Sequence, residues 1–109
     1  RCKYNARRKE MDGHLFDSTK EANGYKELKV LQAAGMISDL DLQPTFTLQE
    51  GFIGMDGKRV RRIAYRADFV YRRNGQCVVE DCKGFCTQAY KLKAKLFRAK
   101  HPDIIFEET

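Results

Sequence analysis

The sequence lacks any long apolar run. No segment approaches the roughly 18 consecutive apolar residues that a membrane-spanning helix requires, and no charged-then-apolar leader opens the chain. There are only two prolines, and no stretch combines low complexity with low hydropathy. The 42% hydrophobic and 33% charged residues are typical of a globular protein. We therefore expect one soluble, cytoplasmic domain over residues 1–109, with no membrane partner.

Closely paired metal ligands of the zinc type are also absent. The four cysteines lie at positions 2, 77, 82 and 86, without the close paired spacing that structural zinc sites show. The other features of the chain are typical of intracellular proteins, so we interpret the cysteines as reduced thiols. We expect neither zinc nor a small-molecule cofactor.

Positive charge exceeds negative charge, giving a formal net charge of +6. Such a balance favours polyanionic partners, because lysines and arginines that neutralise phosphates release counterions. From Lys83 to His101 the chain has no acidic residue. Lys91, Lys95 and Arg98 fall on one face of a predicted helix there, and with Arg66 they are the predicted DNA contacts. The alternative is an ordinary solvated helix face.

Capping and turn signals predict the order of the elements. Asp17 and Ser18 supply a helix N-cap, and Gly35 is placed to end that helix. The second helix is expected to bury Ala89, Leu92, Leu96 and Ala99. The predicted elements are a hairpin or extension over 1–16, a helix over 18–34, extended segments over 37–42 and 45–48, a loop over 51–57, strands over 59–72 and 76–82, a helix over 87–100 and a strand over 103–106. This order predicts a single α/β domain with a mixed central sheet flanked by helices.

The turn at Asn74-Gly75 predicts a pair of facing carboxylates. This dipeptide favours a two-residue hairpin, whose register places Asp68 opposite Asp81 and turns Glu80 to the other face. Facing carboxylates repel unless a cation lies between them or one is protonated. Mg²⁺ prefers such oxygen ligands, together with water and substrate phosphate. The alternative is that both aspartates are solvated and pair with neighbouring cations.

Lys83 follows two residues after Asp81 and is expected on the same face of the strand. Its ammonium group would orient or activate a water and stabilise negative charge that develops on a phosphate. The two aspartates and the lysine therefore predict phosphodiester hydrolysis.

The combination of Asp68 with Asp81-Cys82-Lys83 after a hairpin resembles the signature of the PD-(D/E)XK nuclease superfamily. Ala67 stands where that signature has a proline. The predicted order of helix, three strands, helix and strand is similar to the superfamily's restriction-endonuclease-like αβββαβ core.

Six short segments resemble, more closely, a family of small phage and prophage proteins in that superfamily. They are Lys3-Tyr4-Asn5-Ala6, Phe16-Asp17-Ser18, Lys20-Glu21-Ala22, Leu42-Gln43-Pro44, Ala67-Asp68-Phe69-Val70 and Val79-Glu80-Asp81-Cys82-Lys83-Gly84. The resemblance implies that an acidic residue of the first helix completes the metal site, which by position is Glu21. Ser18 and Glu21 also have capping-box spacing, so Glu21 has a structural alternative.

The expected function is that of a metal-dependent DNA endonuclease using Mg²⁺ or Mn²⁺, with Asp68, Asp81 and Glu21 as metal ligands and Lys83 assisting the attack of water. The phage resemblance implies processing of branched DNA, such as Holliday junction resolution, by a homodimer in the host cytoplasm. One alternative is a DNA-binding module that keeps the nuclease fold without cleavage. Others are an RNA-directed nuclease and a partner in phage assembly.

Overall fold

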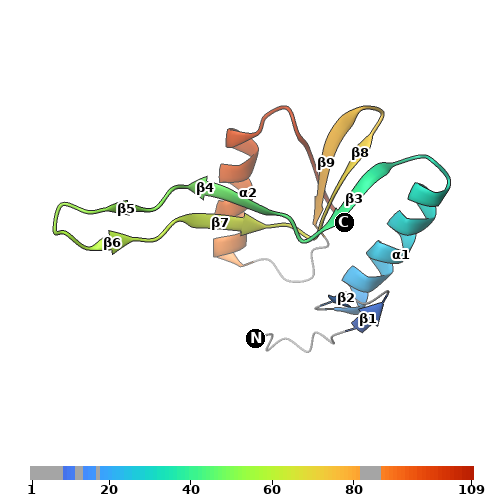
Figure 1. The fold of residues 1–109 in the computed structure, drawn as a ribbon, viewed down its shortest axis with the longest axis horizontal. Coiled ribbons are helices and arrows are strands. Elements are labelled where there is room, and N and C mark those ends of the chain that lie inside the picture. Colours follow the sequence, from blue (N-terminus) through green and yellow to red (C-terminus); the bar gives the residue numbers. More distant parts are fainter. Residues whose placement is uncertain (1–8, 12–13, 17, 82–86) are drawn as a thin grey trace.

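The computed structural model describes residues 9–11, 14–16, 18–81 and 87–109, which form a mixed α/β arrangement (Figure 1). In chain order their elements are β1 (Lys9–Met11), β2 (His14–Phe16), α1 (Thr19–Ala33), β3 (Ser38–Leu42), β4 (Thr45–Gln49), β5 (Phe52–Ile53), β6 (Arg59–Val60), β7 (Ile63–Arg66), β8 (Phe69–Arg73), β9 (Gln76–Asp81), α2 (Gln88–Lys100) and β10 (Ile105–Glu108). The predicted α/β class is confirmed. Within these residues, neither helix combines the length and apolar character needed to cross a bilayer.

The central sheet has four strands in the order β10-β9-β8-β3. β8 is antiparallel to both β3 and β9, whereas β10 is parallel to β9. The helices cover opposite faces, because side chains alternate along β9: Val78 belongs to the hydrophobic cluster of α1, and Val79 to that of α2. The order α1, β3, β8, β9, α2, β10 is the order expected from the sequence.

α1 begins at the predicted cap, and α2 begins at Gln88, one residue after the predicted start at Thr87. The Ser18 Oγ accepts a hydrogen bond from the Glu21 N–H at 3.1 Å, and the Thr87 Oγ1 accepts one from the Tyr90 N–H at 3.0 Å. α1 ends just before Gly35, whose φ of +79° is the left-handed conformation that glycine adopts most easily. At the N-terminus, β1 and β2 pair as the expected hairpin, while Asp12 and Gly13 lie outside the described residues.

The buried face of α2 differs from the prediction. Ala94 and Phe97 are buried, whereas Leu92 is 59% exposed and Leu96 is 39% exposed. Phe97 contacts an aromatic cluster formed by Phe46, Tyr65 and Phe106. A large aromatic ring buries more apolar surface than a leucine, so the helix is oriented by Phe97 rather than by its leucine stripe.

The turn at Asn74-Gly75 is formed as predicted. Both residues have positive φ, 54° and 77°, as the favoured two-residue hairpin requires. The pairs run from Arg73 with Gln76 to Phe69 with Glu80, so the predicted register is confirmed. Glu80 is on the α1 face, opposite to the face of the predicted carboxylate pair.

Residues 59–72 do not form the single strand predicted. β7 pairs with β4, whereas β8 pairs with β3 and β9, and the change of partner falls at Ala67-Asp68. The facing strands β3 and β4 are separated by a bend at Gln43-Pro44, where Gln43 has a φ of +52°. Two backbone hydrogen bonds join the breaks, from the Gln43 N–H to the Asp68 carbonyl at 2.8 Å and from the Ala67 N–H to the Pro44 carbonyl at 3.1 Å.

Residues 51–57, predicted as a loop, contain β5 instead. β5 pairs with β6 and continues the ribbon of β4 and β7 away from the helices (Figure 1). We call residues 50–62 the arm. Its turn is stabilised by hydrogen bonds from the Gly54 N–H to the Lys58 carbonyl and from the Gly57 N–H to the Gly54 carbonyl. A two-residue strand is too short to produce a clear alternating pattern in the sequence.

Candidate functional site

Asp68 and Asp81 lie together at the end of the central strands, on the face covered by α2. Asp81 is the last residue of β9, and Asp68 follows β7 at the break. The side chain and the backbone of Asp68 both hydrogen-bond to Asp81. Two carboxyl groups form such a bond only when they share a proton, because two bare carboxylates repel. The hairpin register and this contact bring Asp68 and Asp81 together, while their roles as metal ligands and catalytic residues stay predictions.

Burial raises the pKa of the Asp81 carboxyl above its ordinary value, since the side chain is 8% exposed. Repulsion by Glu108, the parallel-strand partner of Asp81, acts in the same direction. The hydrogen bonds from Tyr65 and Asp68 oppose this shift by stabilising the charged form. A cation bound at the pair would also favour the charged form and so lower the pKa of Asp81.

Tyr65 is a site residue that the sequence reasoning missed. Its hydroxyl donates a hydrogen bond to Oδ2 of Asp81 from the neighbouring two-stranded sheet. Burial raises the pKa of Tyr65 well above its usual range, and the bond to Asp81 raises it further, so the phenol stays a proton donor. In the sequence, Tyr65 is one of the apolar residues that alternate along the strand predicted over 59–72, and its polar end gives no separate signal.

Glu108 is a second missed residue. It lies beside Asp81 in register, and its Oε2 accepts a hydrogen bond from the Tyr90 hydroxyl at 2.6 Å. The register of β10 could not be read from the sequence, because a parallel strand has no turn to fix its pairing. Among the side chains that the structure describes, those of residues 16, 18–81 and 87–109, no three His, Cys, Asp or Glu groups gather as a metal cluster.

Glu21 is connected to the pair through Gln43. Glu21 is 4% exposed, and its Oε2 accepts a hydrogen bond from Gln43 Nε2 at 3.4 Å. The backbone N–H of the same glutamine donates to the Asp68 carbonyl. The backbone N–H of Glu21 also donates to the Ser18 Oγ, which is one of the two hydrogen bonds of the capping-box alternative. Its role as a metal ligand stays a prediction.

Lys83 lies outside the described residues, together with Cys82 and Cys86. β9 ends at Asp81, two residues before the lysine. The predicted catalytic role of Lys83 therefore stays a prediction.

The predicted basic face of α2 borders a surface groove. Lys91, Lys95 and Arg98 line this groove of about 370 Å³, and Glu108 and Phe106 form its other wall. Because Glu108 lies beside Asp81 in the sheet, the basic groove reaches the neighbourhood of the acid pair. Arg66 is exposed at the end of β7, two residues before Asp68.

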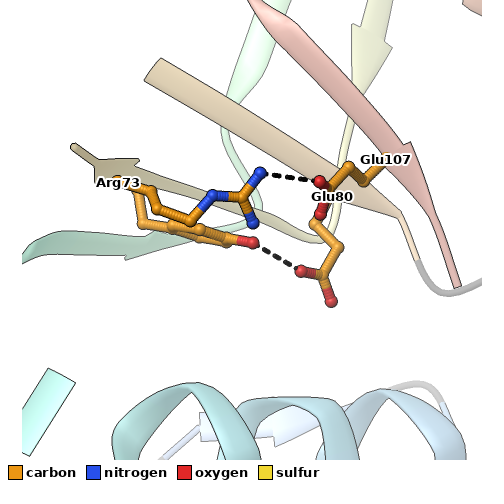
Figure 2. A network of polar contacts seen from close by, with 4 residues as sticks. Arg73, Glu80 and Glu107 are labelled. Atoms are coloured by element: carbon orange, nitrogen blue, oxygen red, sulfur yellow. Dashed lines mark hydrogen bonds and ion pairs between the residues drawn. The ribbon is translucent and has the colours of Figure 1, made fainter. Parts of the chain in front are cut away.

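A second polar network lies on the α1 face of the sheet (Figure 2). The Tyr71 hydroxyl donates to Glu80 Oε1 at 2.8 Å, and Arg73 forms an ion pair with Glu107, also at 2.8 Å. Burial raises the pKa of Glu80, while its bond to Tyr71 opposes the shift. Glu80 is thus separated from Asp81 by the sheet, although the two are adjacent in sequence.

The fold and this site define an α/β domain with a partly buried carboxylate pair at a strand end, beside a basic groove. The chain belongs to the DUF1064 family, described as a protein of unknown function, whose model matches residues 1–107. A search of curated proteins found no match.

Proposed function

We propose that this protein is a metal-dependent DNA endonuclease of the PD-(D/E)XK type. The observation that supports the proposal is the contact between Asp68 and Asp81 at the end of the central strands. A partly buried pair of carboxyl groups costs folding free energy unless a proton or a cation compensates its charge. A function best explains why a pair with this energetic cost lies next to a basic groove.

The donor set fits a hard divalent cation such as Mg²⁺ or Mn²⁺. Asp68 and Asp81 would supply two carboxylates, and water and a substrate phosphate would complete the shell. Bound there, the ion would polarise the phosphate and lower the pKa of a water. Tyr65 holds the Asp81 carboxylate in position by hydrogen bonding, and Gln43 connects Glu21 to the backbone of Asp68.

In this proposal Lys83 orients the attacking water and stabilises charge on the phosphate. Lys91, Lys95 and Arg98 hold the DNA backbone in the groove along α2. Arg66, exposed at the end of β7, adds a further phosphate contact. The phage resemblance extends the proposal to branched DNA such as a four-way junction, cleaved by a homodimer.

The alternative is a DNA-binding protein that does not cleave. It is favoured by the basic groove along α2, since lysines and arginines bind a phosphate backbone without a metal. The basic groove would then act alone, and the acid pair would remain protonated.

The decisive experiment compares two amide variants on the same strand. The parent, Asp81→Asn and Glu80→Gln are incubated with supercoiled plasmid, linear duplex, single strands, a four-way junction and RNA, with Mg²⁺ or chelator. Glu80→Gln is the matched control, because Glu80 is equally buried but lies on the opposite face. We expect Mg²⁺-dependent cleavage of DNA by the parent and the control, and none by Asp81→Asn.

Cleavage without metal, or full activity of Asp81→Asn, would refute the mechanism. DNA binding without cleavage by all three proteins would establish the binding-module alternative. Preferential cleavage of RNA would indicate that the same phosphodiester hydrolysis acts on RNA rather than DNA.

A further inference from the structure

The arm has a composition that the acid pair and the groove do not explain. It contains four cationic residues, Lys58, Arg59, Arg61 and Arg62, against Glu50 and Asp56. Large apolar side chains near its end are also exposed: Phe52 to 50%, Ile53 to 64% and Met55 to 107%. Exposed apolar and cationic side chains on a projecting element indicate contact with another molecule.

Arg59 and Arg61 lie on the same face of the arm. The register is unchanged between the pair Gln49 with Ile63 and the pair Phe52 with Val60, so the two arginines, two residues apart, point the same way. Arg61 lies opposite Gly51, which has no side chain. Among the described residues, no carboxylate pairs with either guanidinium group.

Gly51 is required by close approach of the facing strand. A Cβ atom there would lie 3.0 Å from the Val60 carbonyl oxygen and 3.2 Å from the Arg62 nitrogen. Arg62 itself donates a hydrogen bond to Thr47 Oγ1 at 2.6 Å, which holds its side chain along β4. The ribbon is therefore narrow at the point where Arg61 projects.

We propose that the arm binds duplex DNA in the major groove, with Arg59 and Arg61 contacting backbone phosphates away from the cleavage site. A two-stranded β-ribbon fits the major groove of B-DNA, which is about 12 Å wide. The choice of DNA as the polyanion rests on the proposed function. The proposal adds a second contact region, separate from the α2 groove.

A second copy of this chain fits the arm less well. The exposed apolar side chains are divided between its faces, with Phe52 and Val60 on one and Ile53 on the other. In a two-fold dimer of arms, Arg59 and Arg61 would lie near their own copies and repel them. A phosphate backbone complements the same charges.

The test compares two charge-matched double variants. Arg59→Gln/Arg61→Gln changes the arm, and Lys26→Gln/Lys29→Gln removes two exposed charges from α1, which lies far from the arm (Figure 1). Dissociation constants for a 30-base-pair duplex and a 30-nucleotide single strand are measured against salt concentration, in chelator. Circular dichroism and sedimentation confirm the fold and report the oligomeric state.

We expect the arm variant to bind duplex more weakly, with a salt slope smaller by about 2 because each phosphate contact contributes about 0.9 to that slope. The α1 variant should keep the parent's slope, and binding to the single strand should be affected less. Equal slopes for both variants would overturn the proposal, and so would a change of oligomeric state in the arm variant alone.

Cleavage assays on the same proteins separate this proposal from the proposed function. If the parent cleaves DNA and the arm variant keeps its slope, only the arm proposal fails. If the parent binds DNA without cleaving it and the arm variant loses slope, only the nuclease proposal fails. Absence of any DNA binding by the parent would overturn both.

Discussion

Asp81→Asn should separate the function of the acid pair from the stability of the fold. The amide keeps an oxygen that accepts the Tyr65 hydrogen bond and removes a charge from a site that is 8% exposed. Burying an ion costs several kcal/mol, whereas a hydrogen bond to a charged group returns about 1.5–3 kcal/mol. The raised pKa of Asp81 indicates that burial outweighs the hydrogen bonds. We therefore expect the variant to be at least as stable as the parent at pH 7.5 without metal.

The same raised pKa determines how stability depends on pH. The neutral carboxyl is favoured in the folded state, so the stabilising contribution of Asp81 is fully present below the ordinary aspartate pKa. It is lost as pH rises through the folded-state pKa. Asp81→Asn should remove the part of the decrease in stability with rising pH that Asp81 causes. Urea unfolding in chelator at several pH values from 3 to 8 measures it.

Mg²⁺ should reverse the ranking of the two proteins. At a concentration of about ten times its dissociation constant, the ion stabilises the parent by about 1.4 kcal/mol. For a domain of this size, that corresponds to a rise in Tm of about 6 °C. Asp81→Asn should show no such rise, while Glu80→Gln should respond like the parent. The reasoning is refuted if Mg²⁺ shifts all three proteins equally, or if Asp81→Asn is about 2 kcal/mol less stable than the parent at neutral pH.

Five further substitutions test the supports of the site. Tyr65→Phe removes a donor that lowers the pKa of Asp81, so the acid limb of the cleavage pH profile should move to higher pH; an unmoved limb would contradict this. Phe97→Ala should cost about 3–5 kcal/mol in urea unfolding, and Leu96→Ala, on the same helix but 39% exposed, less than half of that. Gly75→Ala, at a φ of +77°, should cost about 1–2 kcal/mol of stability, whereas Asn74→Gly should be nearly neutral. Equal costs would contradict the importance of the turn for the hairpin register.

The contact between Asp68 and Asp81 was predictable because a local signal determines a long-range pairing. Asn74-Gly75 specifies a two-residue turn, and the turn alone fixes which residues face each other. The ends of the two helices were also predictable from local signals, since Ser18, Gly35 and Thr87 lie at these ends.

The division of residues 59–72 between two sheets was not predictable in this way. Tyr65 and Ala67 belong to the α2 cluster, whereas Phe69 and Tyr71 belong to the α1 cluster, yet all four alternate as they would in one strand. The change of face depends on the facing break at Gln43-Pro44, more than 20 residues away. Periodicity cannot report a partner so distant in sequence.

The bend shared by the two chains at Gln43-Pro44 and Ala67-Asp68 has a consequence for how the molecule can vary. The arm continues β4 and β7, which adjoin this bend, and among the described residues its strands β5 and β6 pair only with each other. Adding two residues to each of its strands would preserve the alternation of side chains and leave the pairing at the base unchanged. The length of the arm can therefore change without any change in the geometry at Asp68 and Asp81.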